Sequence, residues 1–130
     1  MRTPSKLKSF LFAALSAVTV YAQALEIKPY DEAAFQKSQA AGQASVLMFH
    51  ATWCSTCKLQ EKSLDSLKAD ADLKNIIVYK ADFDNSAALQ KAYKVRDRST
   101  LVVVKGAKEV DRLTAVTQVE PIKTLLKKAL

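Results

Sequence analysis

The chain has 130 residues, of which 49% are hydrophobic and 25% charged, and its formal net charge is +7. This length is typical of a single domain, and the hydrophobic content suffices for a packed core, which excludes an intrinsically disordered chain. The positive charge does not by itself indicate nucleic acid binding, because no nucleic-acid-binding motif accompanies it.

Residues 1–24 are predicted to be a cleaved secretory signal. Three basic residues and no acidic one accompany the apolar run 10–20, and the small residues Ala22 and Ala24 follow it, as signal peptidase requires. The run is shorter than the ~20 residues of a membrane span, so an uncleaved anchor is the less favoured alternative. Cleavage after Ala24, or after Ala22, would leave one domain over about 25–130. Loss of the three basic residues lowers the net charge from +7 to +4.

The remaining chain predicts alternating strands and helices. Residues 26–30 are expected to form a short edge strand, and Asp31 is expected to be the N-cap of a helix that ends at Gly42. The nearly continuous apolar run 45–51 predicts a strand buried on both faces.

Helices and strands continue to alternate beyond this strand. A helix is expected to run to about Ala69, with Leu59, Leu64 and Leu67 on its buried stripe. The elements expected after it are a central strand over 75–80, a turn over 82–85, a helix over 86–94, a strand over 100–105, a hairpin turn at 106–107, a strand over 109–115 and a helix over 119–129. This order predicts an α/β fold: a mixed central β-sheet flanked by helices on both sides, with a right-handed βαβ unit.

Two cysteines lie in the run Trp53-Cys54-Ser55-Thr56-Cys57, directly after the buried strand. A bridge across two residues removes little unfolded-state entropy, so this spacing favours a working disulfide over a structural one. Cys54 is expected at the first helical turn, where free N–H groups and the helix dipole favour a thiolate and bring the pKa from about 8.5 toward 7 or below. Cys54 is expected to be the exposed, attacking thiolate, and Cys57, one turn further in, to be more buried and to resolve the mixed disulfide formed by Cys54.

The same spacing also occurs in half of a zinc site. Zinc usually takes four ligands, and this chain offers two cysteines and one histidine, His50. Metal or cluster binding is therefore kept only as a third hypothesis. If the two cysteines form a working disulfide instead, no metal or cofactor is expected.

The residues around the cysteines resemble the active-site segment of the thioredoxin family. The run 49–58, FHATWCSTCK, contains the aromatic residue and the Ala-x-Trp-Cys-x-x-Cys-Lys pattern of that segment. Residues 79–84 and 93–106 are similar to the family's third strand and its approach to the fourth, so the resemblance covers about 26–130. It implies a thioredoxin fold and a dithiol oxidoreductase. Trp53 is then expected to cover the active site, and Ser55 and Thr56 to modulate the reduction potential.

Three positions depart from the family pattern. Ser99 occupies the place of a cis-proline beside the redox pair, so the Arg98–Ser99 bond is expected to be trans, with a hydroxyl and an N–H group facing the sulfurs. Met48 replaces a buried acid, which leaves Lys80 without its family partner and predicts slow resolution unless another base substitutes. His50 occupies an aromatic position, where packing beside the sheet is favoured over a role in proton transfer.

These observations predict an exported thiol–disulfide oxidoreductase, in a bacterial periplasm, that acts on client proteins. The expected partners are those clients and a membrane electron carrier, and the chain is expected to be a monomer that binds no nucleic acid. A non-catalytic interaction module with the same fold is the second hypothesis, because the proline and the acid are both missing.

Overall fold

The computed structural model describes residue 17 and residues 25–130 of the chain. The predicted signal over residues 1–24 lies outside the described residues, apart from the isolated residue 17. The elements, in chain order, are β1 (Leu25–Pro29), α1 (Glu32–Ala40), β2 (Ala44–His50), α2 (Ser55–Ser66), β3 (Ile76–Asp82), the 3₁₀ turn η1 (Phe83–Asn85), α3 (Ala87–Tyr93), β4 (Thr100–Lys105), β5 (Lys108–Thr114) and α4 (Val119–Lys127). This order confirms the predicted α/β fold.

The five strands form one mixed sheet in the order β1-β3-β2-β4-β5. Strands β1 and β2 are both parallel to β3, whereas β4 is antiparallel to β2 and to β5. The predicted edge strand is thus at an edge, and the predicted buried strand β2 is central, with every residue buried. A strand paired on both sides and covered on both faces reads as a continuous apolar run, which is why its sequence does not alternate.

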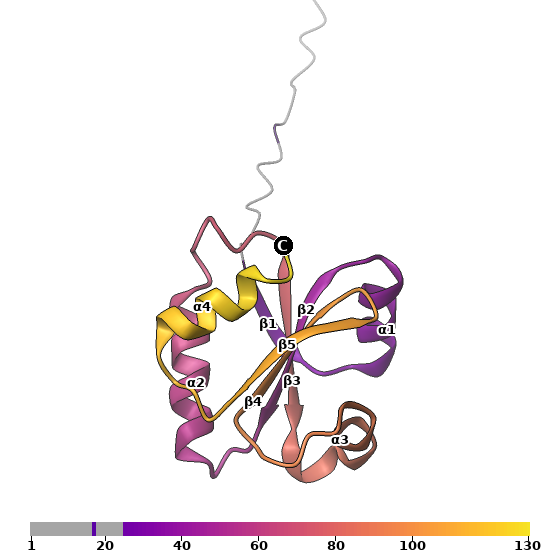
Figure 1. Cartoon of the computed structure of the whole chain (residues 1–130), viewed down its shortest axis with the longest axis vertical. Coiled ribbons are helices and arrows are strands. Elements are labelled where there is room, and N and C mark those ends of the chain that lie inside the picture. The colour runs from indigo at the N-terminus through magenta and orange to yellow at the C-terminus, as the bar shows by residue number, and fades with distance from the viewer. Residues whose placement is uncertain (1–16, 18–24) are drawn as a thin grey trace, which may run out of the picture.

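Helices cover both faces of the sheet (Figure 1). Helices α2 and α4 pack on one face, where their leucines and isoleucine meet alternate sheet residues such as Val46, Met48 and Val103. Helices α1 and α3 pack on the other, where Phe35 and Tyr93 meet Leu47 and Phe49. Because successive strand residues point to opposite faces, β2 supplies both cores at once.

The buried stripe of α2 differs from the prediction at one residue. Leu64 and Leu67 are buried as expected, but the side chain of Leu59 is 55% exposed, so its assignment to the core was wrong. Helical geometry of 3.6 residues per turn places Cys57, Gln60 and Leu64 on one side of α2, and Leu59 then falls on the opposite side. The helix also ends at Ser66 rather than near Ala69.

The end of β2 and the start of β4 place two loops side by side. Phe49 on β2 is paired with Thr100 on β4 in antiparallel register, so the segment that leaves β2 lies next to the segment that enters β4. The first loop contains the two cysteines and the second contains Ser99. Within the described residues, none of the helices combines the length and the apolar character that a membrane span requires.

Candidate redox site

Cys54 is the N-cap residue of α2. Its backbone is extended, with φ −93° and ψ 112°, and its sulfur accepts a hydrogen bond from the Cys57 N–H at 3.2 Å. A residue in this place faces the free N–H groups and the positive end of the helix dipole, both of which stabilise a negative charge. The sequence prediction that Cys54 lies at the helix start is confirmed.

The two thiols differ in acidity. Burial has the largest influence on Cys54 and raises its pKa, but hydrogen bonds from Cys57, from Ser99 and from Arg98 together lower the pKa to about 7. Burial, followed by the hydrogen bond with Cys54, raises the pKa of the Cys57 thiol above its ordinary value. Near neutral pH the negative charge therefore belongs on Cys54 and the proton on Cys57, which is the predicted difference between an attacking and a resolving cysteine.

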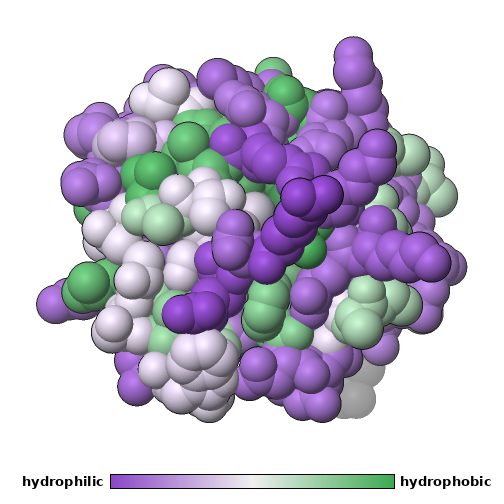
Figure 2. All heavy atoms as spheres, turned by 60° about the horizontal axis from the view of Figure 1, so that its bottom comes forward, coloured by the Kyte–Doolittle hydropathy of each residue, from purple (hydrophilic) through white to green (hydrophobic). Residues whose placement is uncertain are grey.

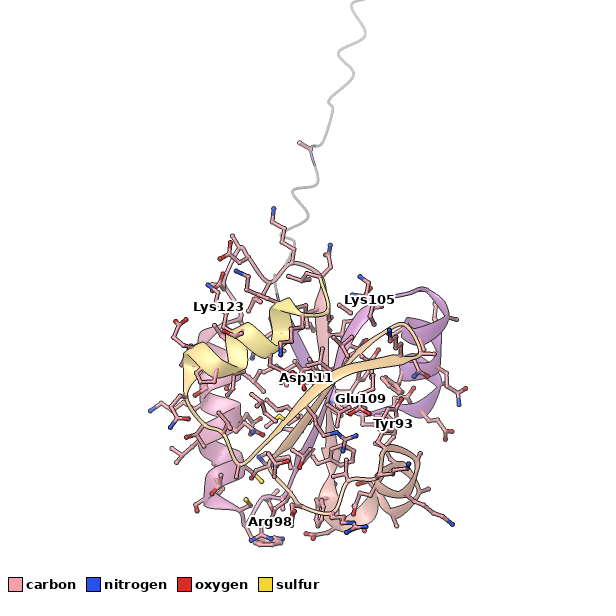
Figure 3. The ribbon with its side chains drawn as sticks, viewed as in Figure 1. Tyr93, Arg98, Lys105, Glu109, Asp111 and Lys123 are labelled. Carbon is pink, nitrogen blue, oxygen red and sulfur yellow. The ribbon has the colours of Figure 1, made fainter. Side chains whose placement is uncertain are left out.

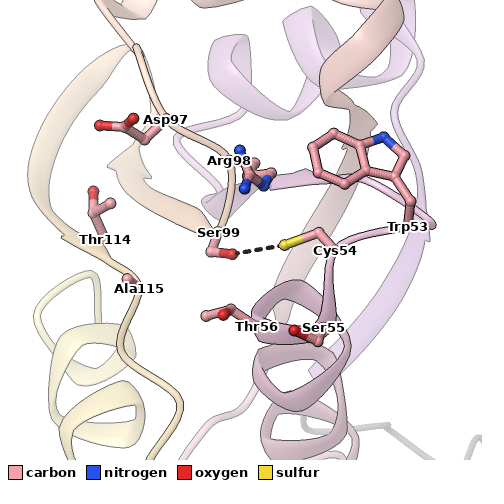
Figure 4. Close-up of a pocket in the computed structure, with 9 residues that line it drawn as sticks. All are labelled: Trp53, Cys54, Ser55, Thr56, Asp97, Arg98, Ser99, Thr114 and Ala115. Atoms are coloured by element: carbon pink, nitrogen blue, oxygen red, sulfur yellow. Dashed lines mark hydrogen bonds between the residues drawn. The ribbon is translucent and has the colours of Figure 1, made fainter.

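Cys54 is less exposed than the sequence prediction of an exposed thiolate implies. Only 5% of its surface is accessible, and Cys57 is completely buried. Cys54 instead lines an open pocket of about 440 Å³, together with Ser55 and Thr56 on its own side and with residues 97–99, Thr114 and Ala115 on the other (Figure 4). A partner sulfur therefore has to enter this pocket to reach Cys54.

The pocket lies at the end of the molecule that is lowest in Figure 1, where the labelled side chain of Arg98 is found in Figure 3. Figure 2 turns this end toward the viewer and shows hydrophobic patches between hydrophilic side chains.

Trp53 forms one wall of the pocket. Its side chain is 58% exposed, its indole N–H donates a hydrogen bond to Asp84 Oδ2 at 2.7 Å, and the Arg98 guanidinium lies 4.5 Å from its ring centroid. The ring is thus fixed from two sides although it faces solvent. This position agrees with the expectation that Trp53 covers the site, and the contacts with Asp84 and Arg98 were not predicted.

Ser99 lies against both sulfurs. No cis peptide bond occurs in the described part of the chain, so the Arg98–Ser99 bond is trans as predicted. The Ser99 hydroxyl is 3.0 Å from Cys57 Sγ and 3.4 Å from Cys54 Sγ, which confirms that a hydroxyl faces them. The N–H group does not, because it donates a hydrogen bond to the Phe49 carbonyl at 2.8 Å.

Lys80 has a partner after all. Its amine donates a hydrogen bond to Glu61 Oε1 at 2.7 Å, and His50 Nε2 lies 3.0 Å from Glu61 Oε2 without the alignment of a hydrogen bond. Lys80 is paired in register with Met48, the residue that replaces the family acid. A carboxylate from α2 therefore occupies the region left without one on the sheet. His50 is buried beside the sheet, as the favoured interpretation expected.

Gln60 is a further residue of the site that the sequence did not lead us to predict. It is completely buried, and its amide nitrogen donates hydrogen bonds to the carbonyls of Ser99 and Val116, both at 3.0 Å. Gln60 and Glu61 follow Cys57 by three and four residues, so helical spacing alone places them on the same side of α2 as the buried thiol. This spacing is the sequence signal that could have identified Gln60 and Glu61 as site residues.

The site thus contains a thiol of lowered pKa, a second thiol one turn away and an open pocket. Both cysteines are free thiols in this structure. Cysteines that begin a helix at i and i+3 are close enough to form a disulfide with little backbone movement. No group of three or more His, Cys, Asp or Glu side chains within the described residues is arranged to hold a metal ion.

Comparisons with known proteins agree on one family. The thioredoxin family model matches residues 26–128. A thioredoxin of Staphylococcus aureus is 34% identical over 82 residues, which span 63% of this chain and 78% of that protein. A thioredoxin of Chlamydia caviae is 34% identical over 68 residues, which span 52% of this chain and 65% of that protein. The crystal structure of Trxlp from Edwardsiella tarda superposes with a TM-score of 0.74 at 32% identity, and covers 78% of this chain and 98% of that one.

Proposed function

Because the chain belongs to the thioredoxin family of thiol–disulfide oxidoreductases, we propose that it is an exported member that exchanges disulfides with client proteins through Cys54 and Cys57. The observation that carries this proposal is the division between the two thiols. Cys54 has a pKa of about 7 and lines an open pocket, whereas Cys57 is buried and has a raised pKa.

In the exchange, the Cys54 thiolate attacks a client disulfide and forms a mixed disulfide. Cys57 then attacks Cys54 Sγ, which releases the client as a dithiol and leaves the Cys54–Cys57 disulfide. The reverse sequence oxidises a client dithiol with the same atoms. The pocket walls formed by Trp53 and Arg98 give a client chain a surface beside Cys54.

An exported enzyme of this kind cannot draw electrons directly from the cytosolic thiol pool. We therefore propose a membrane electron carrier as its redox partner, and a bacterial periplasm as its compartment. The proposal of export rests on the sequence pattern of residues 1–24. Expression of the full chain with mass determination of the mature protein tests it: a mature chain that begins at Leu25 or Gln23 supports export, and retention of Met1 contradicts it.

Reduction of insulin disulfides tests the enzymatic part of the proposal. The wild type should turn over with a small dithiol as electron source. Cys54→Ser should be inactive, whereas Cys57→Ser should form a stable mixed disulfide with the substrate. The two variants remove one sulfur each from the same helix turn and so control for one another. A folded wild type without turnover would leave the non-catalytic interaction module as the better hypothesis.

A further inference from the structure

Ser99 has a backbone conformation that few residues other than glycine adopt. Its φ is +60°, in the left-handed region. Its N–H donates to the Phe49 carbonyl at 2.8 Å, and its own carbonyl accepts from Ala115 N at 2.9 Å and from Gln60 Nε2 at 3.0 Å. Three partners thus hold a strained residue in place, which is typical of functional positions. Only 2% of Ser99 is accessible to solvent.

This conformation places one hydroxyl in contact with both reacting sulfurs. The oxygen lies 3.0 Å from Cys57 Sγ and 3.4 Å from Cys54 Sγ. A serine hydroxyl has one proton to donate and lone pairs with which to accept, so it can accept from one sulfur while it donates to the other. The Cys57 thiol has a second acceptor in the Phe49 carbonyl, but that contact is 4.0 Å long, against 3.0 Å to the Ser99 hydroxyl. Because Cys54 lies at the helix start and Cys57 is fully buried, the favourable arrangement is acceptance from the Cys57 thiol and donation to the Cys54 thiolate.

We propose that the Ser99 hydroxyl is a catalytic group that relays the proton of Cys57 to the sulfur of the departing client during resolution of the mixed disulfide. The proposal rests on the proposed exchange reaction. When Cys54 is bonded to a client, its sulfur no longer carries a charge, and the Ser99 proton is free to bond to the client sulfur attached to it.

The resolution step breaks one disulfide bond and forms another. Cys57 Sγ forms a bond to Cys54 Sγ, the bond between Cys54 Sγ and the client sulfur breaks, and its electron pair leaves with the client. The Cys57 proton passes to the Ser99 oxygen while the Ser99 proton passes to the client sulfur. Cys57 is oxidised, the client sulfur is reduced to a thiol, and Ser99 is regenerated without help from any other reactant.

Three charged side chains are the alternatives to Ser99 as a proton carrier, namely Asp97, Arg98 and Glu61. Asp97 is an exposed residue of the pocket wall, whereas the side chain in contact with both sulfurs is Ser99. Arg98, on the same loop, contributes a hydrogen bond that lowers the pKa of Cys54 and cannot accept a proton. Glu61, one turn after Cys57 on α2, is the competing acceptor, but its two oxygens already face Lys80 at 2.7 Å and His50 at 3.0 Å. Ser99 is in direct contact with Cys57 Sγ, whereas the Glu61 carboxylate is held by two other side chains.

Rapid mixing of the reduced protein with saturating glutathione disulfide tests the relay. Acid quenching and mass spectrometry follow the protein–glutathione mixed disulfide, and saturation isolates its first-order resolution from the initial attack. The variants are Ser99→Ala and Ser99→Gly, which both remove the hydroxyl but differ in how well they tolerate φ +60°. Ser45→Ala is the matched control, because it also removes the hydroxyl of a buried serine, but near the start of β2, at the opposite end of that strand from the cysteines.

Both Ser99 variants should accumulate the mixed disulfide and resolve it about tenfold more slowly at pH 7, as expected for loss of a hydrogen bond to an ionised group. The defect should shrink at high pH, where Cys57 ionises without a relay, and Ser45→Ala should resolve like the wild type. Resolution within twofold of the wild type, a defect that does not change with pH, or recovery of the rate in Ser99→Gly alone would overturn the relay. If the wild type forms no mixed disulfide at all, the proposed exchange itself fails at its first step, before Ser99 acts, and the relay fails with it.

Discussion

The pH dependence of the reduction potential should report the ionisation of Cys54. Reduction of the Cys54–Cys57 disulfide takes up two electrons, together with two protons when both products are thiols but only one when Cys54 is a thiolate. For a two-electron couple, a tenfold change in the equilibrium constant is worth about 30 mV. The potential should therefore fall by about 60 mV per pH unit below the pKa of Cys54 and by about 30 mV per unit above it. The break is expected near pH 7, because the pKa of Cys54 is about 7.

The same ionisation should stabilise the reduced, folded protein. The pKa of Cys54 is about 7 in the folded state and about 8.5 in an unfolded chain, so this contribution is fully present above pH 8.5 and is lost as pH falls through 7. A difference of about 1.5 in pKa corresponds to about 2 kcal/mol in the free energy of unfolding. Cys57 has the opposite sign: its pKa is raised, so its contribution is present below about pH 8.5 and is lost at higher pH. The window that isolates Cys54 is therefore about pH 7 to 8.5.

Equilibration in glutathione redox buffers from about pH 5.5 to 8.5, followed by acid trapping, would measure the potential across the break. Arg98→Gln should move the break to higher pH, because the Arg98 hydrogen bond lowers the pKa of Cys54. Arg96→Gln removes an exposed arginine two residues away and should leave the break in place. One uniform slope of about 60 mV per pH unit across this range would show that Cys54 keeps its proton, and would refute the assignment of Cys54 as the thiolate.

Three further predictions concern the stability of the fold. For each, the free energy of unfolding is measured by urea denaturation monitored by circular dichroism. Leu64→Ala should lower the free energy of unfolding by about 2–5 kcal/mol, because the Leu64 side chain is completely buried. Leu59→Ala, on the exposed side of the same helix, should change it by no more than about 0.5 kcal/mol. Equal effects of the two substitutions would contradict the observed orientation of the helix. Asp31→Ala should cost about 1 kcal/mol, because its side chain caps α1 at 2.8 Å from Ala34 N, and Asp31→Asn should recover most of that loss. Glu61→Gln should cost less than about 1 kcal/mol at pH 7, because Lys80 is 36% exposed and can be solvated; a larger loss would mean that the pair behaves as buried.

Most of the fold could be predicted because each element has a local signal. The continuous apolar run of β2, the Asp31 cap of α1 and the Gly106-Ala107 turn between β4 and β5 depend only on residues near one another in the chain. Leu59 shows the limit of such signals. Hydrophobicity alone assigned it to the core, but the buried stripe of α2 contains a cysteine and a glutamine, which a search for apolar residues passes over.

The candidate site, like the fold, was predictable only where its features depend on residues near one another in the chain. The roles of the two cysteines follow from their places at the start of one helix, so sequence sufficed for them. The contacts of Arg98 with Trp53 and of Glu61 with Lys80 join residues that lie 45 and 19 positions apart, and only the packing of loops and helices brings them together. Sequence correctly showed that Met48 cannot serve as the acid, but it could not show that a helix residue would reach Lys80 instead.

The loss of proline at position 99 and the polar residue at position 60 have a common physical explanation. A proline ring restricts the backbone by itself, because it fixes φ and removes an N–H group. A serine in its place is free to move and has an N–H group that must be satisfied when buried. Here the Phe49 carbonyl accepts that N–H, and the Gln60 amide donates to the Ser99 carbonyl from inside the core. A leucine at position 60 would have no N–H group to donate and could not hold the Ser99 loop in this way. An amide therefore occupies a core position of α2, and the hydroxyl of Ser99 stays within reach of both sulfurs.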